Sequence, residues 1–158
     1  MSATDEQLRA LVGYNIKRAN SGIFAGVEGT LAPFGLRRTT YSALSVIAEN
    51  AEIRQSDLAA VLAIERPNLV QILDELQSAG LISRARDEND RRVYLLAATP
   101  DGIERVAAAS ESLRAYDDRL TKGMSPDERA ALIAALRRIE DNGPEAWEGR
   151  NVEQVSTP

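Results

Sequence analysis

Apolar side chains recur every three or four residues along most of this chain, which is the spacing of one face of an α-helix. The first such run extends from Leu8 to Val27 and predicts a helix of roughly seven turns. Between residues 81 and 98 the pattern changes to that of two short strands around a polar turn. The pattern predicts the remaining helices over about 39–48, 55–62, 65–79, 99–121 and 125–141. The chain is therefore expected to be mainly helical.

Capping residues mark several of the predicted helix ends. Thr4, with a glutamine three residues later, has the pattern of a capping box at the first helix. Thr99 and Ser125 each precede a proline, which is favoured at the first helical position. The sequence Asn142-Gly143-Pro144 predicts the end of the last helix. Residues 142–158 are then expected to form a flexible tail.

Two short predicted helices are consecutive in the sequence, over 55–62 and 65–79, and Gly80 follows where a left-handed cap ends a helix. A hairpin comes next, and its turn reads Asp87-Glu88-Asn89-Asp90-Arg91-Arg92. Helix, turn, helix and an arginine-tipped hairpin is the layout of a winged helix-turn-helix. The expected fold class is mainly α with a small β-hairpin wing, and the predicted lobe spans residues 36–99.

The overall charge opposes a nucleic-acid partner, but its distribution weakens that objection. The chain of 158 residues carries a net charge of −5, whereas nucleic-acid-binding domains are usually basic. Residues 99–158 hold eight basic and twelve acidic side chains, while residues 36–98 hold eight and nine. Most of the excess acid therefore lies outside the predicted lobe.

Composition removes several classes of chemistry. The chain has no cysteine and no histidine, which excludes disulfides, thiol nucleophiles and histidine-based metal sites. No apolar run approaches the roughly 20 residues that span a bilayer. The first residues lack the order of a secretory signal, so we expect a cytoplasmic protein without a membrane partner. We also expect no cofactor.

The helix over 65–79 has an outward face suited to reading DNA. On a helical wheel Pro67 and Gln71 lie opposite the apolar face, flanked by Arg66 and Asn68. Arginine reads guanine and amide side chains read adenine in a major groove. The alternative is an ordinary solvated helix face.

The predicted hairpin favours the DNA reading, because an arginine at a turn tip enters a narrow minor groove readily. Asp90 is close enough in sequence to hold the guanidinium of Arg92. The alternative is an ordinary charged turn. The expected DNA contacts are Thr39, Gln55, Ser56, Arg66, Pro67, Asn68, Gln71, Arg84, Arg86, Asp90, Arg91 and Arg92.

Several segments of residues 5–140 resemble the MarR family of bacterial transcription regulators. The resemblance implies a homodimer whose dimerisation helices are 1–35 and 100–141, with a double-stranded DNA operator as partner. It also implies that the helix near Glu65 reads the major groove. Arg54, where such proteins often have a Ser or Thr cap, and the acidic Glu65 depart from the pattern. The segments are Leu58-Ala59, Arg66-Pro67, Leu73-Asp74-Glu75-Leu76, Gly80-Leu81-Ile82, Asp90-Arg91-Arg92 and Leu95/Leu96 to Thr99.

Proteins similar to this one usually repress an operon until a small molecule binds between the dimerisation helices and the DNA-binding lobe. Basic and aromatic side chains in the first helix and before the second predict an anionic, partly aromatic effector. The alternative is that the cations meet acidic neighbours or phosphates and that the aromatic rings are core. The expected effector-binding residues are Tyr14, Lys17, Arg18, Ile23, Phe34, Arg37, Arg38 and Tyr41.

Two runs, over 37–44 and 63–70, resemble regulators of aromatic-acid catabolism, some of which respond to hydroxycinnamoyl-CoA thioesters. A CoA ligand accounts for several arginines, because guanidinium groups pair well with phosphates. The effector is therefore expected to be a free aromatic acid or its CoA thioester.

Two other classes compete with a regulator. An enzyme is disfavoured, because the sequence has no glycine-rich phosphate loop, no metal-spaced cluster and no nucleophile–base pair. The second is a winged-helix dimer that serves as a protein-interaction module without sequence-specific DNA binding, and the net charge supports it. The sequence favours a ligand-responsive repressor over both.

Overall fold

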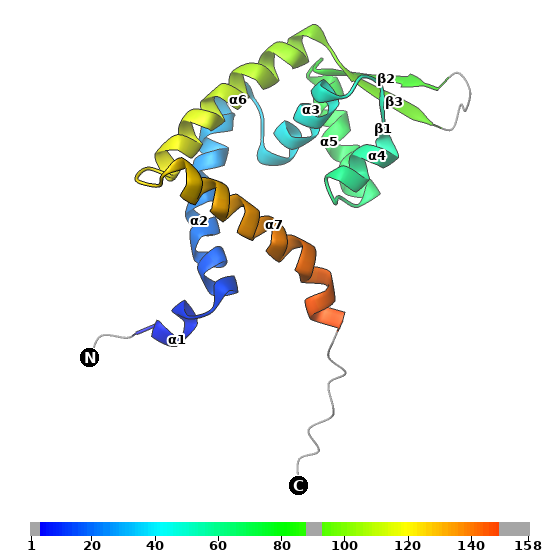
Figure 1. Ribbon diagram of the computed structural model, residues 1–158. Coiled ribbons are helices and arrows are strands. Elements are labelled where there is room, and N and C mark those ends of the chain that lie inside the picture. Colours follow the sequence, from blue (N-terminus) through cyan, green and yellow to red (C-terminus); the bar gives the residue numbers. More distant parts are fainter. Residues whose placement is uncertain (1–3, 88–92, 149–158) are drawn as a thin grey trace. The chain divides into compact units, whose positions relative to one another are not determined.

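The computed structural model describes residues 4–87 and 93–148, with side chains described as far as residue 143. The chain divides into a first compact unit that ends at Leu120 and a second that begins at Thr121. Among the described residues no helix is long and apolar enough to cross a membrane. The first unit contains α1 (Glu6–Arg9), α2 (Val12–Leu31), η1 (Ala32–Phe34), α3 (Arg38–Glu49), β1 (Ile53–Arg54), α4 (Gln55–Val61), α5 (Arg66–Ser78), β2 (Ile82–Arg86), β3 (Tyr94–Ala98) and α6 (Pro100–Leu120) (Figure 1).

The helix-turn-helix lobe is built around one aliphatic core. Leu69, Ile72, Leu73 and Leu76 are the buried residues of α5, so the predicted core face of this helix is confirmed. They pack against buried residues of α3, among them Leu44 and Ile47, and against Leu58 of α4. Burying an aliphatic side chain of this size contributes about 1.5–3 kcal/mol. This core holds α5 with its polar face outward.

The predicted hairpin is present and belongs to a three-stranded antiparallel sheet in the order β1-β3-β2. In the register, Ile53 of β1 and Arg84 of β2 both pair with Leu96 of the central strand β3. Leu96 is fully buried. The free end of the β2–β3 ribbon projects beyond the helices of the lobe (Figure 1), which is the shape of a wing.

A short hydrogen-bonded junction joins α5, the sheet and α6. Gly80 takes the left-handed conformation (φ 72°) that the predicted cap requires. The predicted cap at Thr99 is also confirmed, because the Gly102 N–H donates to Thr99 Oγ1 at 3.1 Å. Thr99 Oγ1 donates in turn to Gly80 O at 2.7 Å. The end of α5 and the start of α6 are thus held by one side chain.

The N-terminal segment differs from the prediction of one continuous helix capped by Thr4. The chain breaks at Leu11, which is extended (φ −93°, ψ 126°), and α1 has Asp5 as its N-cap without a side-chain capping bond. The Asn15 amide donates to Arg9 O at 2.7 Å and to Leu11 O at 2.9 Å. The bond to Arg9 O supplies a side-chain donor to a carbonyl at the end of α1, and the bond to Leu11 O adds to the backbone bond from Asn15 N–H, so that one side chain ties the two helices together across the break.

The second unit contains α7 (Pro126–Glu148). The predicted cap is confirmed, because Ser125 N–H donates to Glu128 at 2.7 Å and Glu128 N–H to Ser125 Oγ at 3.2 Å. That backbone hydrogen bond lowers the pKa of the Glu128 carboxyl. The predicted stop at Asn142-Gly143-Pro144 is wrong, since α7 continues through it. Proline already has a helical φ, and the following residues Glu145-Ala146 are good helix formers.

The close approach of α6 to the junction makes Gly102 irreplaceable. A Cβ added there would collide with the Leu81 carbonyl oxygen and lie 3.3 Å from Leu44 Cδ1. We expect Gly102→Ala to lower the free energy of unfolding by about 2–3 kcal/mol, because a backbone atom cannot move aside cheaply. Denaturant unfolding at fixed protein concentration measures this change.

Gly29→Ala is the control, because nothing lies within 4 Å of an added Cβ there. It is expected to stabilise α2 by up to about 1 kcal/mol. Equal unfolding free energies for the two variants would contradict the tight junction.

Candidate nucleic-acid interface and ligand pocket

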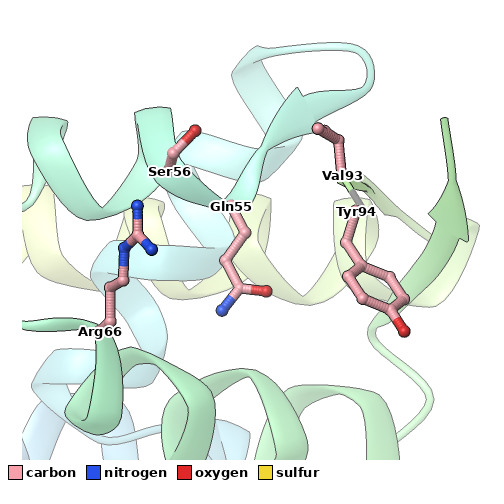
Figure 2. A pocket seen from close by; sticks show the side chains of 5 residues that line it. All are labelled: Gln55, Ser56, Arg66, Val93 and Tyr94. Atoms are coloured by element: carbon pink, nitrogen blue, oxygen red, sulfur yellow. The ribbon is translucent and has the colours of Figure 1, made fainter. Parts of the chain in front are cut away.

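A polar hollow of about 310 Å³ lies at the start of α4, beside the start of α5 and the beginning of β3. Figure 2 shows Gln55 and Ser56 placed between Arg66 on one side and Tyr94 on the other. Gln55, Ser56 and Arg66 are predicted DNA contacts, and the fold brings them together. Hydroxyl, amide and guanidinium groups are the usual partners of phosphate oxygens.

The first two turns of α5 present the predicted reading residues outward. Arg66, Pro67, Asn68 and Gln71 are all exposed, as the helical wheel requires. Pro67 stands in the first turn, where its missing N–H costs no helical bond. Thr39, in contrast, is half-buried on α3 and does not line the hollow.

The wing strands place the predicted arginines in different roles. Arg84 of β2 donates through Nη2 to Asp74 Oδ1 of α5 at 2.7 Å, and its side chain is only 18% exposed. Arg86 is exposed and lies over the ring of Tyr94, with 5.6 Å from Cζ to the ring centroid. The predicted tip contacts Asp90, Arg91 and Arg92 lie outside the described residues.

Tyr94 is a candidate contact that the sequence reading missed. It is 40% exposed, pairs with Arg86 near the far end of the β2–β3 ribbon and lines the hollow. The signal was present, since Tyr94 is the one aromatic residue between positions 42 and 115 of the sequence. An exposed tyrosine beside Arg86 offers both a ring face and a hydroxyl to a nucleic-acid backbone.

A second cavity, of about 390 Å³, lies among α2, α3 and α6 of the first unit. Two tyrosine hydroxyls bridge its walls: Tyr41 and Ser110 are hydrogen-bonded at 2.9 Å, and Tyr116 donates to Ile23 O at 3.2 Å. The ring of Tyr116 fills the space that a side chain at Gly26 would occupy. The lining residues are Ile23, Val27, Tyr41, Ser45, Glu49, Ser110, Leu113, Arg114, Tyr116, Asp117 and Leu120.

Two of the eight predicted effector residues, Ile23 and Tyr41, line this cavity. The cation that lines it is Arg114, which was not among the predicted residues. Arg114 of α6 is exposed and lines the cavity, together with the carboxylates of Glu49 and Asp117. Sequence periodicity could not single out Arg114, because it lies on a helix rich in charged residues.

The remaining predicted effector residues have other neighbours or lie open to solvent. Arg37 donates to both carboxylate oxygens of Glu75, at 2.6 and 2.5 Å, and this partner raises the pKa of Arg37. Arg38 lies over the ring of Phe24 at 3.8 Å and 3.4 Å from Glu28.

Two aromatic residues of the predicted set are also engaged elsewhere. The Tyr14 hydroxyl donates to Asp5 at 2.9 Å, which lowers the pKa of that carboxyl. Phe34 packs against the core. Lys17 and Arg18 are exposed on α2.

The described residues contain no group of three or more acidic side chains that could hold a metal ion.

Comparisons with known proteins agree with this geometry. Residues 34–93 match the profile of the MarR family. A Thauera aromatica protein, named for transcriptional regulation of the hcr operon, is 30% identical over 129 residues, which are 81% of this chain and 78% of that protein. The structure of the transcriptional repressor CouR bound to a 23-mer DNA duplex has 33% identity and a TM-score of 0.84, and covers 89% of this chain and 99% of the other.

The structure of CouR bound to p-coumaroyl-CoA has 31% identity and a TM-score of 0.77, and covers 88% of this chain and 98% of the other. Identity at this level over nearly the whole described fold, together with the profile match across the lobe, settles the family. The chain belongs to the MarR family of DNA-binding transcriptional regulators, which are not enzymes.

Proposed function

We propose that this regulator is a homodimeric repressor that binds a palindromic operator and is released by an anionic aromatic effector, either a free aromatic acid or its CoA thioester. The cavity among α2, α3 and α6 is the observation that carries the proposal. It has an aromatic and apolar wall and borders α3, a helix of the DNA-binding lobe. The similarity to CouR, whose structure with p-coumaroyl-CoA is known, supports the same ligand class.

The chemistry of the cavity selects the orientation of such a ligand. Tyr41, Tyr116 and Leu113 suit an aromatic ring, and Ser45 or Ser110 suits a ring hydroxyl. Glu49 and Asp117 repel an anion placed near them. The negative group of the effector therefore belongs beside Arg114.

A CoA thioester places most of its negative charge away from its acyl group. Its acyl end fits the cavity, and its phosphates would extend to cations on the surface. Lys17 and Arg18 of α2 are exposed and available for that purpose. Arg37 and Arg38 are engaged with acidic neighbours and would have to exchange partners.

A homodimer accounts for apolar side chains that the single chain leaves open. Leu11 is 57% and Val12 62% exposed at the start of α2. On α7, Leu132, Ile133, Leu136 and Ile139 form a stripe whose members are 41–45% exposed. Exposed stripes of this kind mark association surfaces, and a second copy of the chain supplies a matching apolar surface.

Effector binding reaches the DNA-reading residues through α3. Its Tyr41, Ser45 and Glu49 line the cavity, and the same helix packs on α5. A ligand that separates Tyr41 from Ser110 of α6 would shift α3 and, with it, α5. Two copies of α5 would then no longer match half-sites about 10 base pairs apart.

The DNA-binding side of the proposal is tested with a duplex of about 25 base pairs, long enough for two half-sites, selected by the protein from a random library. Arg66→Ala is expected to weaken binding about fivefold to a hundredfold and to relax base preference at one position in each half-site. Fluorescence anisotropy against salt concentration measures both affinity and the number of phosphate contacts.

Arg18→Ala is the matched control, because Arg18 is an exposed arginine on α2, outside the hollow. It is expected to bind DNA like the wild type. Binding that is absent, or that does not change with salt, would favour a protein-interaction module and reject the operator proposal.

The effector side is tested by thermal unfolding with p-coumaric acid and p-coumaroyl-CoA as probes. A ligand at a hundredfold excess over its Kd should raise the Tm by about 5–10 °C. Arg114→Ala is expected to reduce that shift, because the anion loses its partner. Arg105→Ala is the control, since Arg105 lies on the same helix but does not line the cavity. No stabilisation by either probe would reject this ligand class.

A further inference from the structure

Two adjacent acids, Asp74 and Glu75, lie in the second half of the recognition helix α5, and each is paired with an arginine from a different element. Asp74 accepts a hydrogen bond from Arg84 of β2 at 2.7 Å. Glu75 accepts from Arg37, which precedes α3, at 2.6 and 2.5 Å. Both acids on this face of the DNA-binding helix are therefore partly neutralised by the protein itself.

The two pairs differ in burial. The side chains of Arg37 and Glu75 are 59% and 52% exposed, and an exposed pair of this kind contributes little to a fixed geometry. In the second pair the difference lies in the arginine: the Arg84 side chain is 18% exposed and its Nε is fully covered without a hydrogen-bond partner, whereas Asp74 is 61% exposed. A half-buried guanidinium with one strong charged bond holds its position much better.

Arg84 stands where a restraint on the wing has the most effect. It lies at the middle of β2 and pairs in register with the buried Leu96 of β3. Beyond it the ribbon carries the paired Arg86 and Tyr94, of which Tyr94 lines the hollow. The angle between ribbon and helix decides whether both meet the same DNA.

We propose that Arg84 and Asp74 are positioning residues that hold the wing at a fixed angle to the recognition helix, and that Arg84 is not itself a DNA contact. Asp74, an acid on the DNA-facing helix, then aids DNA binding through Arg84. This inference rests on the family's DNA binding and does not depend on the proposed effector.

The competing interpretation, in which Arg84 binds a phosphate, predicts the opposite sign for one substitution. If Asp74 only competes with DNA for Arg84, then Asp74→Asn frees the arginine, removes a negative charge and strengthens binding. If Asp74 positions the wing through Arg84, the same change weakens binding, although it makes the protein less acidic.

The experiment compares Asp74→Asn with Glu75→Gln, which removes the neighbouring acid from the same helix. Anisotropy with the selected duplex is expected to show a roughly five- to tenfold loss for Asp74→Asn, the size of one typical protein hydrogen bond. Glu75→Gln is expected to bind equally well or up to about threefold more tightly, because it removes a negative charge near the DNA and breaks only an exposed ion pair. Equal or tighter binding by Asp74→Asn would overturn the proposal.

Salt dependence supplies a readout that a loss of stability would not change. Asp74→Asn removes no cation, so a smaller slope of log K against log salt means that phosphate contacts of the wing are lost. We expect the slope to fall by at least about one contact per dimer. A slope equal to that of the wild type would overturn the positioning role.

A double-mutant cycle with Arg84→Gln completes the test. If the two residues act as one unit, the double variant binds no more weakly than the worse single variant. Multiplicative losses would mean that Arg84 contacts DNA independently and would also overturn the proposal. Arg84→Lys, which keeps the charge, is expected to retain more than half of the wild-type affinity and serves if Arg84→Gln does not fold.

Discussion

The architecture depends on the junction where Thr99 joins the end of the recognition helix to the start of α6. Thr99 N–H donates to Leu81 O at 3.0 Å, and Leu81 N–H donates to Leu76 O of α5 at 2.9 Å. The Thr99 hydroxyl adds bonds with Gly80 and Gly102. Because Gly102 allows the Leu81 carbonyl to approach α6 directly, the start of α6, the base of the wing and the end of α5 are held together at one point.

The helix α3 gives the lobe a second connection to its surroundings, and this one passes through the cavity. Tyr41, Ser45 and Glu49 line the cavity on α3, while Arg37 just before it holds Glu75 of α5. A change at the cavity wall therefore has a physical route to α5 through packed side chains and one ion pair. The Thr99 junction is rigid, whereas the exposed Arg37–Glu75 pair can exchange partners at little cost. The lobe therefore has a closely packed connection at Thr99 and an exposed ion pair at Arg37.

The sequence predicts best the features that depend on local patterns. The core face of α5, the caps at Thr99 and Ser125 and the hairpin follow from spacing and turn chemistry, and the structure has all of them. The break at Leu11 is stabilised by Asn15, and the helical passage through Pro144 depends on residues that follow it. The local pattern predicts no helix end at Leu11, and it predicts an end at Pro144 where the helix continues. The candidate cavity was predicted least well, because whether Arg38 meets Glu28 or Arg114 faces a pocket depends on how distant helices pack.

The net negative charge of the chain argues against DNA binding only if the ion pairs among its side chains are ignored. Two of the acids on the recognition helix are taken up by Arg84 and Arg37, so the field near α5 is less negative than the sequence implies. The same pairing removes Arg84 and Arg37 from the cations available to a phosphate. Within residues 4–87 and 93–143, Arg66 at the start of α5 and Arg86 above the Tyr94 ring are exposed arginines that the structure does not pair with an acid. Arg66 and Tyr94 line the same hollow, and Arg86 lies beside Tyr94. A change in the angle between the helix and the wing would therefore alter which of these side chains a single DNA duplex can meet.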